Sequence, residues 1–171
     1  MAAGGKAQAF ACNITDRAQV DAAVAAAEAQ LGPIDILVNN AGWDIFKPFT
    51  KTVPAEWDKL IAINLTGALH MHHAVLPGMV ARGGGRIVNI ASTAGKWGSR
   101  NQSAYNVSKH AVVGLTRCVA LEASPFAVTV NAICPGFVQT DMVEELKAQT
   151  AASSGMSGDE MVRAAIARVP L

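Results

Sequence analysis

Short apolar runs alternate with longer helical patterns along the whole of this chain, which limits the folds open to it. A run of four to eight apolar residues bounded by turn residues is typical of a buried strand. Strands separated by helices form right-handed βαβ units, and such units require a mainly parallel sheet. The sequence therefore predicts a single α/β domain with a mainly parallel sheet flanked by helices. The predicted strands are 6–12, 34–38, 86–90 and 127–134.

Residues that begin and end helices mark the segments between these strands. Asp16 predicts an N-cap with Gln19 as its capping-box partner. Pro54 is well suited to the first turn of a long helix, and the three glycines at 83–85 are suited to ending it. The predicted helices are 16–31, 54–82, 103–123 and one or two amphipathic helices in 141–167, interrupted near 153–158.

Composition narrows the class of protein. The 171 residues are 51% hydrophobic with a net charge of +1, enough for a substantial core and without bias toward nucleic acid or other polyanions. We find no apolar stretch long enough to span a bilayer and no signal-peptide pattern, so we expect a cytoplasmic protein without membrane contact. Cys12, Cys118 and Cys134 are odd in number and far apart, so we expect buried thiols rather than disulfides or a zinc site.

Tyr105 and Lys109 form the most informative chemical pattern. Residues four apart share a helix face, so the phenol and the ammonium would lie in mutual reach. A neighbouring cation favours phenolate, so we expect Lys109 to lower the pKa of Tyr105 toward neutrality. Tyr105 could then exchange a proton with an alcohol or ketone, with the Ser92 hydroxyl bonded to the same substrate oxygen.

The chain resembles the short-chain dehydrogenase/reductase family in several motifs that occur in the family's order. These are Asn39-Asn40-Ala41-Gly42, Asn64, Ser92, the Tyr105 and Lys109 pair, Pro135-Gly136 and Thr140. The resemblance is closest to reductases of 3-oxoacyl thioesters and to polyketide ketoreductases. It implies a Rossmann-like, doubly wound sheet, NAD or NADP as cofactor, and interconversion of a small-molecule ketone and a secondary alcohol.

The resemblance also assigns roles to individual residues. Tyr105 would be the catalytic acid/base, Ser92 would orient the substrate oxygen, Lys109 would also bond the nicotinamide ribose, and Asn64 would hold a proton-relay water. Segment 141–167 would be a substrate lid, and the helices in 54–82 and 103–123 would mediate a homo-oligomer. The residues expected at the cofactor are Asn13, Ile14, Asn40, Ala41, Gly42, Tyr105, Lys109, Pro135, Gly136 and Thr140.

The chain departs from the family at both ends. The family's opening strand, Gly-rich turn and helix, which cradle the pyrophosphate, are absent, as is its last strand, so residues 1–171 resemble the middle of such a domain. Without the Gly-rich loop, nucleotide binding stays open, as does the choice between NAD and NADP. The alternatives are a non-catalytic oligomerising remnant, with a strand edge uncovered, or a hydrolase with Ser92 as nucleophile and Tyr105 as base. His70, His72 and His73 lack further ligands for a metal site, so we expect a solvated or subunit-facing surface.

Overall fold

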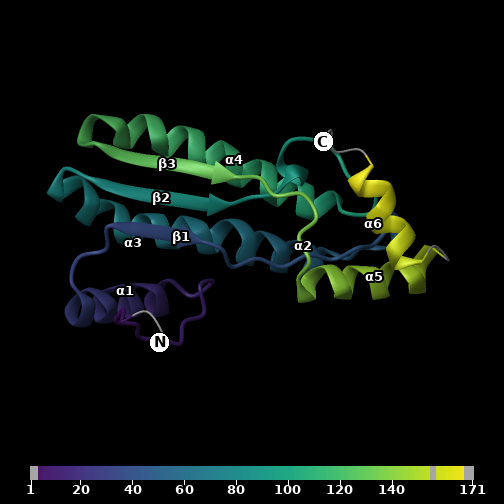
Figure 1. Ribbon diagram of the computed structural model, residues 1–171, viewed down its shortest axis with the longest axis horizontal. Coiled ribbons are helices and arrows are strands. Elements are labelled where there is room, and N and C mark those ends of the chain that lie inside the picture. Colours follow the sequence, from purple (N-terminus) through teal and green to yellow (C-terminus); the bar gives the residue numbers. More distant parts are fainter. Residues whose placement is uncertain (1–3, 155–156, 168–171) are drawn as a thin grey trace.

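A three-stranded parallel sheet organises the computed structural model, which describes residues 4–154 and 157–167. The strands are β1 (Ile36–Asn39), β2 (Gly85–Ile90) and β3 (Val128–Ile133), and they lie in the order β1-β2-β3. Both neighbouring pairs are parallel. The predicted α/β class with a parallel sheet is therefore confirmed (Figure 1).

Helices follow the strands in the predicted alternation. α3 (Gly67–Arg82) packs against β1 and β2, α4 (Ser103–Ala123) packs against β3, and α1 (Arg17–Leu31) packs against α3. No helix in the described parts of the chain is both long and apolar enough to cross a membrane. The helices are α1 (Arg17–Leu31), α2 (Pro54–Ile61), a π-helical turn (Ala62–Thr66), α3 (Gly67–Arg82), α4 (Ser103–Ala123), α5 (Asp141–Ser154) and α6 (Gly158–Ile166), with 3₁₀ turns at Phe49–Lys51, Thr93–Gly95 and Ser124–Phe126.

The capping residues act largely as predicted. The Asp16 carboxylate accepts hydrogen bonds from the backbone N–H groups of Ala18 and Gln19, which fixes the start of α1. The Gln19 amide departs from a strict capping box, because its oxygen accepts from the Asn13 N–H at 3.0 Å. Gly83 ends α3 in the left-handed conformation, with φ 69°, which glycine adopts without strain.

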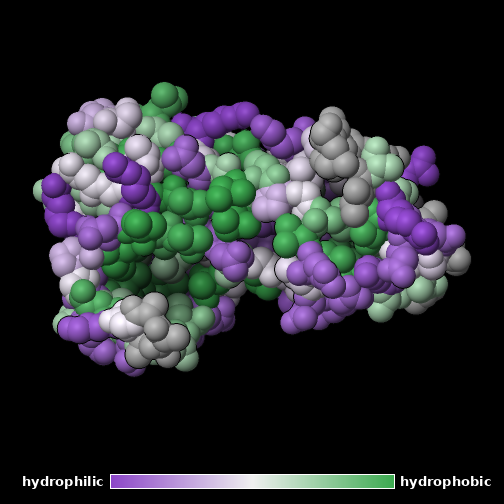
Figure 2. All heavy atoms as spheres, in the orientation of Figure 1, coloured by the Kyte–Doolittle hydropathy of each residue, from purple (hydrophilic) through white to green (hydrophobic). Residues whose placement is uncertain are grey.

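The two faces of the sheet differ in burial. Leu37, Ile87 and Val130 are paired across the three strands, and their exposed fractions are 7%, 0% and 5%. Ile36 and Val38, on the opposite face of β1, are 64% and 54% exposed. Figure 2 shows hydrophobic side chains gathered over this side of the sheet. The expectation that 34–38 is a buried strand is wrong for this face, because the described helices that pack on the strands cover the other one.

The predicted first strand is wrong. Residues 6–12 have no regular structure, and most of their side chains are exposed. A strand is stabilised by hydrogen bonds to a neighbouring strand. No described strand pairs with 6–12, and the outer edge of β1 is likewise unpaired within the described residues. The apolar pattern of 6–12 is therefore not enough to make it extend the sheet.

Two further surface expectations need correction. Cys118 is exposed rather than buried, while Cys12 and Cys134 are partly buried. His72 is 3% exposed rather than solvated, because its position on α3 faces the sheet. Its Nδ1 lies 2.8 Å from the Ala68 carbonyl oxygen and its Nε2 lies 3.3 Å from Asn89 Nδ2. His72 therefore belongs to a buried polar network between α3 and β2.

Candidate active site

A cleft of about 600 Å³ lies just past the carboxyl ends of the three strands. This is the place where open α/β sheets bind their ligands. Its walls come from the loops after β1, β2 and β3, from the first turns of α4, and from α5 through Val143 and Leu146. The predicted site residues that line this cleft are Asn40, Ala41, Gly42, Ser92, Tyr105, Lys109, Pro135, Gly136 and Thr140.

Tyr105 and Lys109 lie on one face of α4, as their spacing predicts. Lys109 Nζ is 5.7 Å from the centre of the Tyr105 ring and donates a hydrogen bond of 2.9 Å to the Ile90 carbonyl oxygen. Lys109 is only 5% exposed, so its ammonium is anchored at the end of β2. The helix thus fixes the phenol and the ammonium as neighbours in the cleft.

Burial changes the acid–base properties of this pair. It raises the pKa of Tyr105 above its ordinary value, against a lowering by the hydrogen bond with Ser92 and with a further raising by the charge of Asp44. Burial also lowers the pKa of Lys109. The net pKa shift of Tyr105 is therefore upward and not toward neutrality as expected, because desolvation dominates and Lys109 is not among its causes. Tyr105 is therefore a neutral phenol in this cleft at neutral pH.

Ser92 is held against α4 by the short turn that follows β2. Its hydroxyl oxygen accepts a hydrogen bond of 3.1 Å from the Ala94 N–H, which caps the turn Thr93–Gly95. A Cβ added to Gly95 would lie 2.7 Å from the Lys109 carbonyl oxygen, which is closer than real contacts allow. The turn can approach α4 this closely only because residue 95 is glycine. This contact positions Ser92 beside Tyr105.

Asn64 connects the loop after β1 to α4. It lies in the π-helical turn, is 3% exposed, and its oxygen accepts from the Trp43 N–H at 2.8 Å. Its amide nitrogen donates to the Trp43 carbonyl at 2.9 Å and to Ser108 Oγ at 3.0 Å. These bonds hold the loop in place, which is the structural role expected of a buried asparagine in a helix. The predicted role in holding a relay water stays a prediction.

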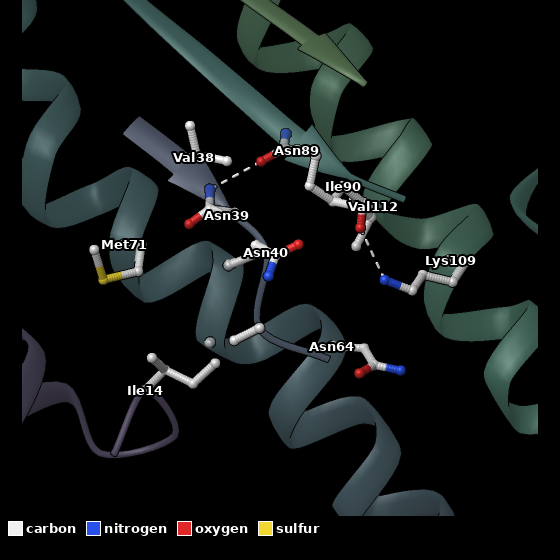
Figure 3. Close-up of a pocket in the computed structure, with 13 residues that line it drawn as sticks. Ile14, Val38, Asn39, Asn40, Asn64, Met71, Asn89, Ile90, Lys109 and Val112 are labelled. Carbon is white, nitrogen blue, oxygen red and sulfur yellow. Dashed lines mark hydrogen bonds between the residues drawn. The ribbon is translucent and has the colours of Figure 1, made fainter. Parts of the chain in front are cut away.

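A second hollow of about 120 Å³ lies beside the cleft, and Lys109 and Asn64 border it (Figure 3). Asn40 and Ala41 line both spaces, whereas Ile14 and Met71 line only this hollow. Ile14 is thus placed beside the predicted cofactor residues after β1. Asn13 is not brought to either space, since its side-chain oxygen accepts hydrogen bonds from the Thr15 N–H and hydroxyl.

A buried polar network supports the floor of this hollow. Asn89 is fully buried, accepts from Asn39 Nδ2 at 2.8 Å and donates to Thr116 Oγ1 at 2.9 Å. The Thr116 hydroxyl in turn donates a hydrogen bond of 2.7 Å to the Val112 carbonyl oxygen. A buried polar group is stable only when it is bonded in this way. The network therefore ties β1, β2 and α4 together directly beneath the site.

Asp44 is a site residue that the sequence did not reveal. It is 5% exposed, lines the cleft with Tyr105, accepts from the Ile45 N–H at 2.7 Å and is bonded by the Gln102 amide. Burial raises its pKa to about 6, with the Gln102 bond opposing that shift. The only signal in the sequence is an acid placed between Trp43 and Ile45, and no spacing to another polar residue marks it.

Comparison with known proteins identifies the family. A family model described as short chain dehydrogenase matches residues 1–151. The chain belongs to this family. It is 48% identical over 120 residues to an acetoacetyl-CoA reductase of Rhizobium meliloti, covering 70% of this chain and 50% of the reductase. It is 40% identical over 151 residues to a D-beta-hydroxybutyrate dehydrogenase of Cupriavidus necator, covering 88% of this chain and 58% of the relative.

A solved structure agrees with this assignment. The F189W actinorhodin polyketide ketoreductase with NADPH is 38% identical and superposes with a TM-score of 0.86 over 93% of this chain and 62% of that one. The Rossmann-like class and the family resemblance are therefore confirmed. The chain nevertheless spans only about half to two thirds of the length of these relatives.

Proposed function

We propose that this chain carries the catalytic part of an NAD(P)-dependent oxidoreductase that interconverts a ketone and a secondary alcohol, with 3-oxoacyl thioesters as the substrate class. The observation that carries the proposal is the meeting of Ser92, Tyr105 and Lys109 in one cleft at the carboxyl ends of the strands. The names of the relatives, an acetoacetyl-CoA reductase and a polyketide ketoreductase, support the substrate class.

The site geometry suits carbonyl reduction. Ser92 and Tyr105 can each donate a hydrogen bond to a carbonyl oxygen, which polarises the carbonyl as negative charge develops on the oxygen. Tyr105, which is a protonated phenol at neutral pH, then gives its proton to that oxygen as general acid. The bound nicotinamide would supply the hydride to the carbonyl carbon.

The residues present fit one half of the dinucleotide better than the other. Lys109 Nζ, the backbone after β1 and the Thr140 hydroxyl border the cleft and offer donors to a nicotinamide and its ribose. Within residues 4–154 and 157–167, no glycine-rich turn joins a strand to a helix to cradle a pyrophosphate. We therefore assign the nicotinamide half to this cleft and expect weak binding of the whole dinucleotide by this chain.

The open face of the sheet favours a second candidate, a non-catalytic oligomerising protein. Ile36, Val38 and Ile133 are each more than half exposed, and apolar side chains gathered on one surface often mark an interface. For this candidate, Ser92, Tyr105 and Lys109 are present but the chain catalyses no reaction. Homo-oligomer formation is compatible with both candidates.

The test of function combines nucleotide binding with turnover. We expect NADH or NADPH to raise the melting temperature of the wild-type chain, since a ligand of the folded state stabilises it. We expect reduction of a 3-oxoacyl thioester to fall by about 100-fold to 10,000-fold in Tyr105→Phe. Ser99→Ala, which also alters a serine lining the cleft, is the matched control and should keep its activity.

The outcomes separate the candidate functions. Loss of turnover in Tyr105→Phe with nucleotide binding retained supports the oxidoreductase. A wild type that neither binds nucleotide nor reduces the thioester supports the oligomerising protein. Cleavage of activated esters without nucleotide, dependent on Ser92, would instead support a hydrolase.

A further inference from the structure

Asp44 places a buried carboxylate inside the proposed substrate cleft. Its side chain is fixed from two directions, by the Ile45 N–H from its own loop and by the amide of Gln102 at the start of α4. The carboxylate is therefore held beside Tyr105, which follows Gln102 by three residues in the chain. A substrate that reaches the Tyr105 hydroxyl must share the cleft with Asp44.

The charges in the cleft are already balanced. Among the described residues that line it, Asp44 and Lys109 are the charged ones, and both are 5% exposed. Each stabilises the charge of the other, because the ionised carboxylate favours the protonated ammonium. A second acid, Glu145 of α5, borders the adjoining hollow of about 240 Å³ together with Asp44. The protein's own carboxylates, Asp44 and Glu145, therefore already supply negative charge at this site.

We infer that Asp44 makes the cleft selective for uncharged carbonyl compounds, such as 3-oxo esters and thioesters, and excludes free 3-oxo carboxylates. A free acid would bring a second anion into a buried site whose single ammonium, on Lys109, already interacts electrostatically with the Asp44 carboxylate. An ester or thioester has the same carbonyl without that charge. This inference rests on the proposed function and names the substrate class of the same site.

The selectivity should depend on pH through Asp44. Burial raises its pKa to about 6, so it is ionised at pH 8 and mostly protonated at pH 5. The titratable and charged groups that face it are Tyr105 and Lys109 of α4 and Glu145 of α5. Ordinary carboxylic acids titrate near ~4, so a free 3-oxo acid stays mostly ionised at pH 5. Exclusion of the acid should therefore weaken as the pH falls from 8 to 5.

The test compares acetoacetate with methyl acetoacetate, which share a carbon skeleton and differ in charge. Their dissociation constants are measured by chemical-shift titration of the protein without nucleotide, so that the result does not depend on turnover. For the wild type at pH 8, we expect the ester to bind at least about tenfold more tightly, which corresponds to ~1.4 kcal/mol. At pH 5 this ratio should fall toward one.

Asp44→Asn keeps the size of the side chain and removes its charge. We expect this variant to lose most of the preference for the ester at pH 8, because the Lys109 ammonium is then free to attract the acid. Asp35→Asn is the matched control, since it removes an exposed carboxylate beside β1 and outside the cleft. Its ester preference should equal that of the wild type.

Each result has a distinct meaning. Equal binding of acid and ester by the wild type at pH 8, or an unchanged preference in Asp44→Asn, would overturn the role of Asp44 and leave the oxidoreductase proposal standing. A wild type that binds neither compound, even at high concentration, would overturn both proposals.

Discussion

The helix-covered face and the open face of the sheet carry similar side chains but differ in burial. Ile87 on the covered face is fully buried, whereas Ile36 on the open face is 64% exposed, although both are strand isoleucines. The difference lies in what packs on each face rather than in the residue type. Because α4, on the covered side, carries Tyr105 and Lys109, the site is built on the part of the molecule whose packing is complete.

The sharpest test of this comparison is to truncate one isoleucine on each face. We expect Ile87→Ala to lower the free energy of unfolding by about 2–5 kcal/mol, since it removes buried methyl groups and leaves a cavity. Ile36→Ala should change it by less than about 0.5 kcal/mol, because its side chain is already largely in water. Urea unfolding followed by circular dichroism measures both. Equal losses would show that the open face is covered in solution.

The buried Asp44 carboxylate in the cleft lowers the free energy of unfolding when it is ionised, and this effect can be measured. The folded pKa of Asp44 is raised to about 6 from 3.8, so the folded state binds this proton more tightly than the unfolded state. Its contribution to stability is therefore present below pH ~4 and is lost as the pH rises through 6. We expect Asp44→Asn to gain up to about 3 kcal/mol over the wild type at pH 8.

The extra stability of Asp44→Asn should shrink as the pH falls from 8 and should vanish near pH ~4. Unfolding curves of both proteins recorded between these pH values measure it. His72 has the opposite effect on stability. Burial lowers its pKa, so its contribution to the free energy of unfolding is lost as the pH falls below 6.5. The difference between the Asp44→Asn and wild-type curves cancels the His72 contribution. A gain that is the same at pH 4 and pH 8 would contradict the assigned cause.

The contact between the Ser92 turn and α4 tests how tightly the covered side is packed. Gly95→Ala should cost about 1–3 kcal/mol, since its Cβ would meet the backbone of Lys109 and push the turn away. Gly98→Ala is the control, because no atom lies within 4 Å of the added Cβ and the effect should be small. If the two glycine variants unfold alike, the close approach of turn and helix does not exist in solution.

The smallest effect on stability is expected for a charge on the open face. Val38→Lys should shift the free energy of unfolding by less than about 0.5 kcal/mol, since the residue is 54% exposed. It should nevertheless reduce self-association in light scattering and binding of a hydrophobic dye, because it interrupts the apolar surface. Thr129→Lys, at an exposed strand position without a large apolar side chain, is the control. Unchanged dye binding in Val38→Lys would show that the apolar surface responsible for dye binding lies elsewhere.

Local signals allowed most elements to be predicted from the sequence. α4 matches its predicted bounds, and the start of α1 follows from Asp16, because capping and helical periodicity depend on residues close in the chain. Segment 6–12 does not form its predicted strand, because strand formation depends on a partner strand, which its own sequence does not supply. The same limit explains why the exposure of Val38 was not foreseen.

The site could be predicted in position but not in electrostatics. Motifs at three strand ends predicted where Tyr105, Lys109 and Ser92 would meet. Spacing alone gave the proximity of Lys109 to Tyr105, but the direction of the pKa shift depends on desolvation by elements distant in the sequence. Asp44 was missed for the same reason, since its importance comes from burial beneath α5 and α4 and from no motif of its own.

The π-helical turn Ala62–Thr66 has a consequence for how this chain tolerates insertions and deletions. A π turn contains one residue more than the α turn it replaces, so α2 and α3 are joined out of phase by that residue. Deleting one position there would restore a continuous α-helix with both halves close to their present orientation, because the π turn holds its extra residue as a local widening, but the residues of the turn itself would be displaced. The helix would survive such a change, but Asn64 and the loop it clamps could not keep their present alignment. Sequence length in this single turn is therefore coupled to the shape of the cleft.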